Sequence, residues 1–122
     1  MLNGALILVA EDQPFIAMEL GFAVEDAGGV VVGPAASVQT ALALIKEQSI
    51  AAAILDFNLT DGDATPIIAL LSASNIPIII QSGVGLMPEL LLRFPRLIVF
   101  TKPNNPEELI AKLETFVATT TN

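Results

Sequence analysis

The 122-residue chain contains no cysteine, no histidine, no tryptophan and no tyrosine. Without cysteine it can form no disulfide and can offer no thiolate as a nucleophile. Without histidine it cannot carry a Ser-His or Cys-His catalytic pair. A zinc site is not expected either, because cysteine and histidine are the usual zinc ligands.

Charged residues are scarce at 15% of the chain, and only 5 of them are basic against 13 acids. With a net charge of −8 and no basic stripe, we expect neither nucleic acid nor an anionic membrane as a partner. Hydrophobic residues make up 53%, which excludes a disordered segment. The length suits one core. We therefore predict a single domain over residues 1–122 with no output domain and a frayed tail at 119–122.

One charge-free stretch, from Ala64 to Pro88, is long enough to span a bilayer. Pro66, Pro77 and Gly83 divide it, however, into pieces as long as one buried helix and one buried strand. The N-terminus lacks the basic start and the cleavage site of a signal peptide. We therefore predict no membrane segment and a cytoplasmic location.

Five short apolar runs alternate with five helical patterns. The predicted strands cover residues 5–10, 30–34, 51–55, 76–81 and 97–101. The predicted helices cover about 14–27, 38–48, 64–74, 87–93 and 106–118. The strands are continuously apolar, as in a parallel sheet that helices cover on both faces. Right-handed crossovers then give an α/β fold, a doubly wound three-layer sandwich around a five-stranded parallel sheet.

Residues with known capping preferences lie at the predicted helix boundaries. Pro14 suits a first helical position, and Gly28-Gly29 should stop that helix. Ser37 can cap the second helix, and Asn105 can cap the fifth.

Charged side chains follow three of the predicted strands. Glu11-Asp12 follow the first, Asp56 the third and Lys102 the fifth. Because the carboxyl ends of parallel strands form one edge, where ligands bind, the three acids and the lysine should converge. Mg²⁺ prefers oxygen ligands, which Asp12, Asp56 and the backbone carbonyl of Asn58 could supply, while Glu11 could hold a coordinated water.

Ser82 closes the fourth predicted strand and offers a hydroxyl at the same edge. A carboxylate nucleophile at Asp56, a metal, Lys102 and a hydroxyl are the parts that phosphoryl transfer needs. Each residue taken alone has a simpler explanation, such as a helix start or a turn. Their joint placement, with each at the end of a separate strand, favours a functional site.

The ordered motifs resemble those of response regulator receiver domains of two-component systems, over essentially the whole chain. The matching segments run from Leu8 to Pro14, from Ala53 to Leu59, from Pro77 to Gly83 and from Thr101 to Pro103. The resemblance implies a CheY-like, flavodoxin-like fold. It also implies a protein that accepts a phosphoryl group with self-catalysed transfer and autodephosphorylation, rather than an enzyme.

The resemblance also assigns roles to individual residues. It implies that Asp56 is phosphorylated by a phosphohistidine of a histidine kinase or histidine phosphotransfer domain. Mg²⁺ would be bound by Asp12, Asp56 and the Asn58 carbonyl, with Glu11 acting through water. Ser82 would bond the acquired phosphoryl oxygen and Lys102 would pair with it, beside a cis peptide bond to Pro103. The protein would signal by docking or serve as a phosphate shuttle or sink.

The chain departs from the family pattern at several positions. Thr60 replaces the usual proline, and Val99 replaces the aromatic residue three positions before the lysine. Phe100, on the opposite pleat, is a poor substitute in an aromatic rotamer switch. The short third helix, Ser82-Gly83 and the absent aromatic residue are similar to single-domain regulators that serve the HWE class of histidine kinases.

Three other functions fit parts of the sequence. Asp56 to Thr60 matches the nucleophile loop of haloacid-dehalogenase-type phosphatases, but Asn58 cannot be the general acid there and the chain is short for that family. A flavodoxin would need a hydroxyl-rich phosphate loop after the first strand, which is missing. A receiver-like interaction module without phosphorylation is the third, and intact Asp56, Ser82 and Lys102 argue against it.

The first predicted helix carries apolar residues on two faces. One face, with Ile16, Leu20, Ala23, Val24 and Ala27, should pack on the sheet, while Phe15, Met18 and Phe22 project to the opposite side. This outer stripe is either a partly covered patch without a role or a docking site for the helices of a phosphohistidine-bearing domain. A homodimer through the elements at 87–93, 97–101 and 106–118 is a further expectation.

Overall fold

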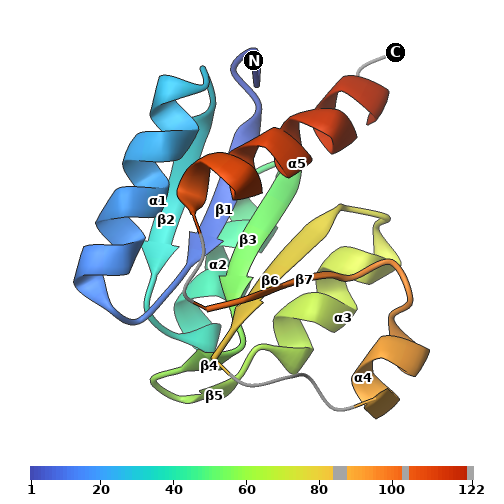
Figure 1. Cartoon of the computed structure of the whole chain (residues 1–122). Helices are drawn as coiled ribbons and strands as arrows, with labels where there is room; N and C mark the ends of the chain where they lie inside the picture. Colours follow the sequence, from blue (N-terminus) through green and yellow to red (C-terminus); the bar gives the residue numbers. More distant parts are fainter. Residues whose placement is uncertain (84–87, 103–104, 121–122) are drawn as a thin grey trace.

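The structure is a computed structural model, and it describes residues 1–83, 88–102 and 105–120, without the side chains of 118–120. Its main sheet has five parallel strands in the order β2-β1-β3-β6-β7 (Figure 1). The strands are β1 (Leu6–Ala10), β2 (Val30–Ala35), β3 (Ala52–Asp56), β6 (Ile78–Ser82) and β7 (Ile98–Thr101). Each lies within a residue or two of its predicted range, so the predicted parallel α/β sheet is confirmed.

Five helices cover the two faces of this sheet (Figure 1). They are α1 (Pro14–Asp26), α2 (Val38–Glu47), α3 (Thr65–Ala73), α4 (Pro88–Arg93) and α5 (Pro106–Thr120). Buried residues of α1 and α5 belong to one core cluster, and those of α2, α3 and α4 belong to the other. The chain thus forms the predicted three-layer sandwich.

The two core clusters follow the alternation of side chains along each strand. In β3, Ala52 and Ile54 face the α1 and α5 layer, whereas Ala53 and Leu55 face the α2 and α3 layer. Because both faces are covered, every residue of β3 and β6 is buried, and this explains why their sequences are continuously apolar until the last positions.

The predicted caps of the first helices are present. Pro14 begins α1, and the chain leaves this helix through Gly28, whose positive φ of 86° suits glycine. The Ser37 side chain accepts a hydrogen bond from the amide of Thr40 at 3.1 Å.

At the C-terminal helix, Asn105 Oδ1 accepts from the amide of Glu107 at 2.9 Å. The helix α5 continues to Thr120, which is two residues into the tail predicted at 119–122, and the frayed tail stays a prediction. Adding one residue to a formed helix requires no new nucleation, so low-propensity threonines can extend it. Residue 87, at the predicted start of the fourth helix, lies outside the described residues, as does Pro103 with its predicted cis bond.

A short hairpin between β3 and α3 was not predicted. Its strands β4 (Asn58–Leu59) and β5 (Gly62–Asp63) pair antiparallel. Within the turn, the carboxylate of Asp61 accepts hydrogen bonds from the amides of Val38 and Gln39 at 2.6 and 3.1 Å. These bonds lower the pKa of Asp61, most through Val38, and they cap α2 from a distant part of the chain. The Asp61-Gly62 dipeptide is the turn signal that could have indicated the hairpin.

Candidate functional site

The strand order reverses between β1 and β3, and this topological switch point is where open α/β sheets bind ligands. Glu11 and Asp12 follow β1, and Asp56 is the last residue of β3. One carboxylate oxygen from each of these three acids lies within 4.8 Å of the others. The three acids that the sequence placed at one edge therefore form a single cluster.

Lys102 brings a positive charge to this cluster from the end of β7. Its Nζ donates to Oε1 of Glu11 and to Oδ2 of Asp56, both at 3.1 Å. Its side chain is 20% exposed, whereas those of Glu11 and Asp56 are 1% and 10% exposed. Lys102 is thus the most exposed of the three residues, and it bridges the carboxylate of Glu11, after β1, and that of Asp56, at the end of the neighbouring strand β3.

The buried position of Glu11 changes its acidity. Burial, followed by the contact with Asp56, raises the pKa of Glu11 to about 7, against the opposing effects of the Gln13 amide and Lys102. Burial alone would lower the pKa of Lys102, but its hydrogen bonds to Asp56 and Glu11 outweigh this and leave the pKa above its ordinary value. Three acids share one lysine, so full ionisation would leave two negative charges.

Ser82 is the last residue of β6 and is buried beside this edge. Its carbonyl accepts a hydrogen bond from the backbone amide of Lys102 at 2.8 Å, which continues the pairing of β6 with β7 past the strand ends. Ser82 and Lys102 are thereby fixed side by side in the backbone.

Gln81 was not among the predicted site residues, yet it is buried directly opposite Asp56 in the β3–β6 register. Its carbonyl accepts from the amide of Phe57 at 3.2 Å. A polar residue directly before Ser82, at the carboxyl end of an otherwise apolar strand, was the signal in the sequence that could have pointed to it.

The backbone after Asp56 is held on two sides. The amide of Asn58 donates to Asp56 Oδ1 at 3.3 Å. Two residues later, both the amide and the hydroxyl of Thr60 donate to the carbonyl of Ala36 at 3.1 Å. Thr60, which stands where the family usually has proline, thus fixes this loop to the segment that precedes α2.

The outer face of α1 is apolar and accessible. Phe15, Met18 and Phe22 are 73%, 46% and 58% exposed, while Leu20 and Val24 on the inner face are buried. A groove of about 600 Å³ runs along this helix, and its lining extends from Glu11 and Asp12 to Met18, Phe22 and Pro34. Two residues of the apolar stripe, Met18 and Phe22, and two of the three clustered acids, Glu11 and Asp12, therefore line the same groove.

In β7, Ile98 and Phe100 pack against the α1 and α5 core cluster. Val99 lies on the opposite pleat of the strand and is half-buried. The position that often carries the family's aromatic switch is thus a small aliphatic side chain, and Phe100 points to the other layer.

The family model described as the response regulator receiver domain matches residues 7–114 of the chain. Among solved structures, the solution structure of SdrG from Sphingomonas melonis Fr1 is 33% identical with a TM-score of 0.77, and the match covers 97% of this chain and 99% of that one. No curated protein gives a significant sequence match.

Two further solved structures show how widely this fold is used. The anti-anti-sigma factor PhyR from Bartonella quintana is 26% identical with a TM-score of 0.75, over 95% of this chain and 48% of PhyR. A CheY-like response regulator receiver domain from Methanospirillum hungatei JF-1 is 21% identical with a TM-score of 0.83, over 95% of both chains. At that identity the second likeness shows the fold alone.

Proposed function

The chain belongs to the response regulator receiver family of two-component phosphorelay signalling, and we propose that Asp56 is its phosphoacceptor. The observation that carries this assignment is the position of the Asp56 carboxylate. It lies at the switch point of the sheet, 3.1 Å from the Lys102 ammonium and within 4.8 Å of Glu11 and Asp12. No other carboxylate in this cluster ends a strand while contacting the lysine.

In the proposed reaction, a carboxylate oxygen of Asp56 attacks the phosphorus of a phosphohistidine on the donor protein. The new O–P bond forms as the P–N bond breaks, and the imidazole leaves with the bonding electron pair. Lys102 moves from the Asp56 oxygen to an oxygen of the arriving phosphoryl group and offsets its charge. The chain acts as the acceptor, rather than as an enzyme that turns over a separate substrate.

We propose Mg²⁺ as the cofactor of this transfer. Three clustered carboxylates and one ammonium carry a net charge of −2 when all are ionised. This donor set of charged oxygens fits a hard divalent cation. Asp12, Asp56 and the Asn58 carbonyl would hold the ion, with Glu11 acting through a water. When bound, it would neutralise phosphoryl oxygens and favour the ionised form of Glu11.

Ser82 has a separate role in this proposal. Its hydroxyl would bond the phosphoryl oxygen after transfer and pass the change on to α4, which is the next helix along the chain after Ser82. A Ser82→Ala variant should therefore still be phosphorylated but should show smaller amide shifts around residues 83–93 upon phosphorylation.

A histidine kinase or histidine phosphotransfer domain is the proposed donor, since this chain has no histidine of its own. The proposed docking residues are the exposed Phe15, Met18 and Phe22, of which Met18 and Phe22 line a groove that also reaches Glu11 and Asp12. Among the described residues, no helix is both long and apolar enough to cross a membrane. The single-domain organisation, the cytoplasmic location, the HWE-class donor and a homodimer through α4, β7 and α5 stay predictions.

Incubation with acetyl phosphate and Mg²⁺, followed by intact-mass measurement, tests the assignment directly. The wild type should gain one phosphoryl group, and Asp56→Asn should gain none. Asp63→Asn, in the exposed hairpin that follows Asp56, is the matched control and should still be labelled. Labelling that persists in Asp56→Asn would place the acceptor elsewhere, and no labelling of the wild type would favour the interaction module without phosphorylation.

A further inference from the structure

A second cavity lies at the end of the sheet away from the acid cluster, where β6 and β7 begin. Its volume is about 560 Å³, which is within the usual range for small-molecule sites. Its walls come from the end of α3, the loop into β6, the end of α4, the loop into β7 and one residue of α5. The cavity shares no lining residue with the groove beside α1.

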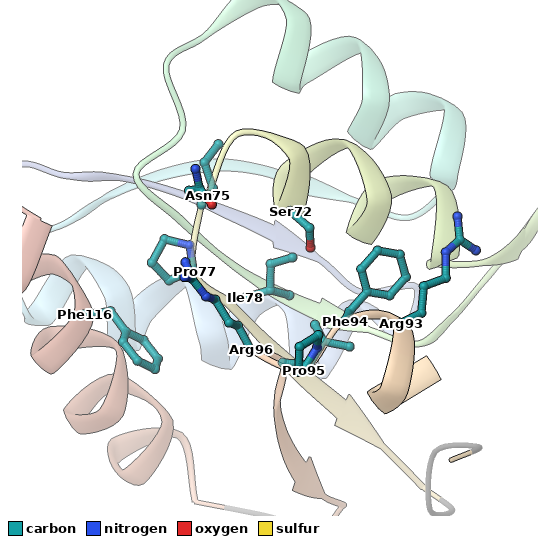
Figure 2. Close-up of a pocket in the computed structure, with 11 residues that line it drawn as sticks. Ser72, Asn75, Pro77, Ile78, Arg93, Phe94, Pro95, Arg96 and Phe116 are labelled. Atoms are coloured by element: carbon teal, nitrogen blue, oxygen red, sulfur yellow. The ribbon is translucent and has the colours of Figure 1, made fainter. Parts of the chain in front are cut away.

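The floor and sides of this cavity are apolar. Ile76, Ile78 and Leu97 lie along it, and Figure 2 shows Phe94 and Phe116 projecting from either side of Ile78. Both rings are half-buried, so each presents one part of its surface to the cavity. Aromatic rings at both ends of an aliphatic floor give this cavity an apolar lining that suits an apolar group.

The charges around the cavity are all of one sign. Its lining includes Arg93 and Arg96, which are two of the chain's 5 basic residues, but none of its 13 acids. A third base, Lys112, lies above the Phe116 ring at 5.9 Å. Within the described part of the chain, neither arginine forms an ion pair with an acid. This local positive charge on a protein of net charge −8 suits an anion.

The two arginines differ in what they can contact. Figure 2 shows Arg96 extending across the cavity beside Pro77, whereas the Arg93 guanidinium lies beyond the Phe94 ring, 4.9 Å from its centroid. Arg96 can therefore reach a bound oxyanion directly with its forked donors. Arg93 is held against the aromatic wall and contributes its charge from the rim.

We propose that this cavity binds a small amphiphilic anion, with its apolar body against the apolar lining of the cavity and its oxyanion head on Arg96. Ser72 and Asn75, which also line the cavity, supply a hydroxyl and an amide for the head or for a polar substituent. A cavity of about 560 Å³ suits a small molecule, and a second copy of the chain, as in the homodimer predicted through α4, β7 and α5, is the competing occupant that the test below separates from it. The proposal does not depend on phosphorylation of Asp56.

Two fluorescent probes with the same aromatic body separate the apolar and the anionic parts of this proposal. The sulfonate 8-anilinonaphthalene-1-sulfonate carries the charge, and N-phenyl-1-naphthylamine lacks it. Both are titrated into the full, unphosphorylated chain, and amide shifts map the site. We expect one sulfonate per chain, with the largest shifts at residues 75–78 and 93–97.

Substitutions then test the anion contact and the cavity volume separately. Arg96→Gln should weaken sulfonate binding about tenfold, as expected for one lost charge-assisted hydrogen bond, and leave the neutral probe unchanged. Lys46→Gln on α2, which removes an exposed charge outside the cavity, is the matched control and should change neither. Ser72→Phe should fill the cavity and weaken both probes, with the amide spectrum confirming that each variant is folded.

Several results would overturn the proposal. Equal sulfonate affinity in the wild type and Arg96→Gln would show that the cavity does not select an anion. Shifts concentrated around Phe15 and Phe22 would place the probe in the α1 groove instead. Concentration-dependent shifts at residues 93–97 without any probe would make a second copy the occupant.

Discussion

The two ends of the sheet carry opposite charge, although β6 and β7 contribute to both. At the carboxyl ends, three acids lie close together, and the two that are buried, Glu11 and Asp56, are paired with Lys102. At the amino ends, Arg93 and Arg96 are exposed and pair with no acid of the described chain. A five-residue strand such as β6 separates the two ends by only roughly 16 Å. Because the two ends are so close, their different chemistry does not come from distance. It comes from the burial and ion pairing of the acids at the carboxyl end and from the exposed arginines at the amino end, which form no ion pair within the described chain.

If phosphoryl transfer takes place at the carboxyl end of the sheet alone, loss of Lys102 should have the largest effect on the rate of phosphorylation. Lys102→Met removes the ammonium that bonds both Asp56 and Glu11, so labelling by acetyl phosphate should slow by about 100-fold. Lys46→Met, the same substitution on the exposed face of α2, should leave the rate within about twofold of the wild type. A rate for Lys102→Met close to that of the wild type would show that this cation does not act in the transfer.

The second test asks whether the donor protein approaches the carboxyl end along α1. Phe22→Ala should slow transfer from the cognate kinase at least about tenfold, because a central aromatic contact is worth about 2 kcal/mol. Labelling by acetyl phosphate should be unchanged, since Phe22 supplies no charge or hydrogen bond to the phosphoryl group. Leu92→Ala, at an 82% exposed position on α4, is the matched control. Equal losses in both reactions would mean that Phe22→Ala damages the fold.

The dependence of the unfolding free energy on pH should distinguish the two ends of the sheet. Glu11 at the carboxyl end titrates near neutral pH, whereas the arginines at the amino end stay charged. The pKa of Glu11 is about 7 in the folded chain against an ordinary 4.5, so the folded state holds this proton longer. Its stabilising effect is therefore complete below about pH 4.5 and is lost as the pH rises towards 7.

We expect the metal-free protein to lose of the order of 2 kcal/mol of unfolding free energy across this window. Glu11→Gln, which resembles the protonated acid, should flatten the profile when urea unfolding is measured in the presence of a chelator. Added Mg²⁺ should stabilise the wild type more at pH 8 than at pH 5. A wild-type profile as flat as that of Glu11→Gln would contradict a raised pKa.

The smallest effect should come from the loop that holds the carboxyl end in place. Thr60→Val removes the hydroxyl bond to the Ala36 carbonyl and keeps the backbone bond, so stability should fall by about 0.5–1 kcal/mol. The expected result is a slightly lower urea midpoint with an unchanged labelling rate. A gain in stability would show that this hydroxyl bond contributes nothing to holding the loop.

Most of the acid cluster could be predicted because each member follows a strand that is visible in the sequence. Asp56 and Lys102 end apolar runs, and parallel strands bring such ends to one edge. Asp61 could not be assigned in this way, since its partners Val38 and Gln39 are more than 20 residues away and meet it only through the fold. Gln81 is similar, because its place opposite Asp56 depends on the register of β3 and β6.

The strand and helix pattern, the parallel sheet and the residues at its carboxyl edge could all be read from the order of the amino acids. These follow from local periodicity, from capping residues and from the one-way direction of parallel strands. Only the tertiary structure decided that Glu11 is buried enough for its pKa to reach about 7, and that Arg93, Arg96 and Phe116 line one cavity. Burial and cavities depend on how crossovers stack distant segments, and that information does not lie in any single stretch of the chain.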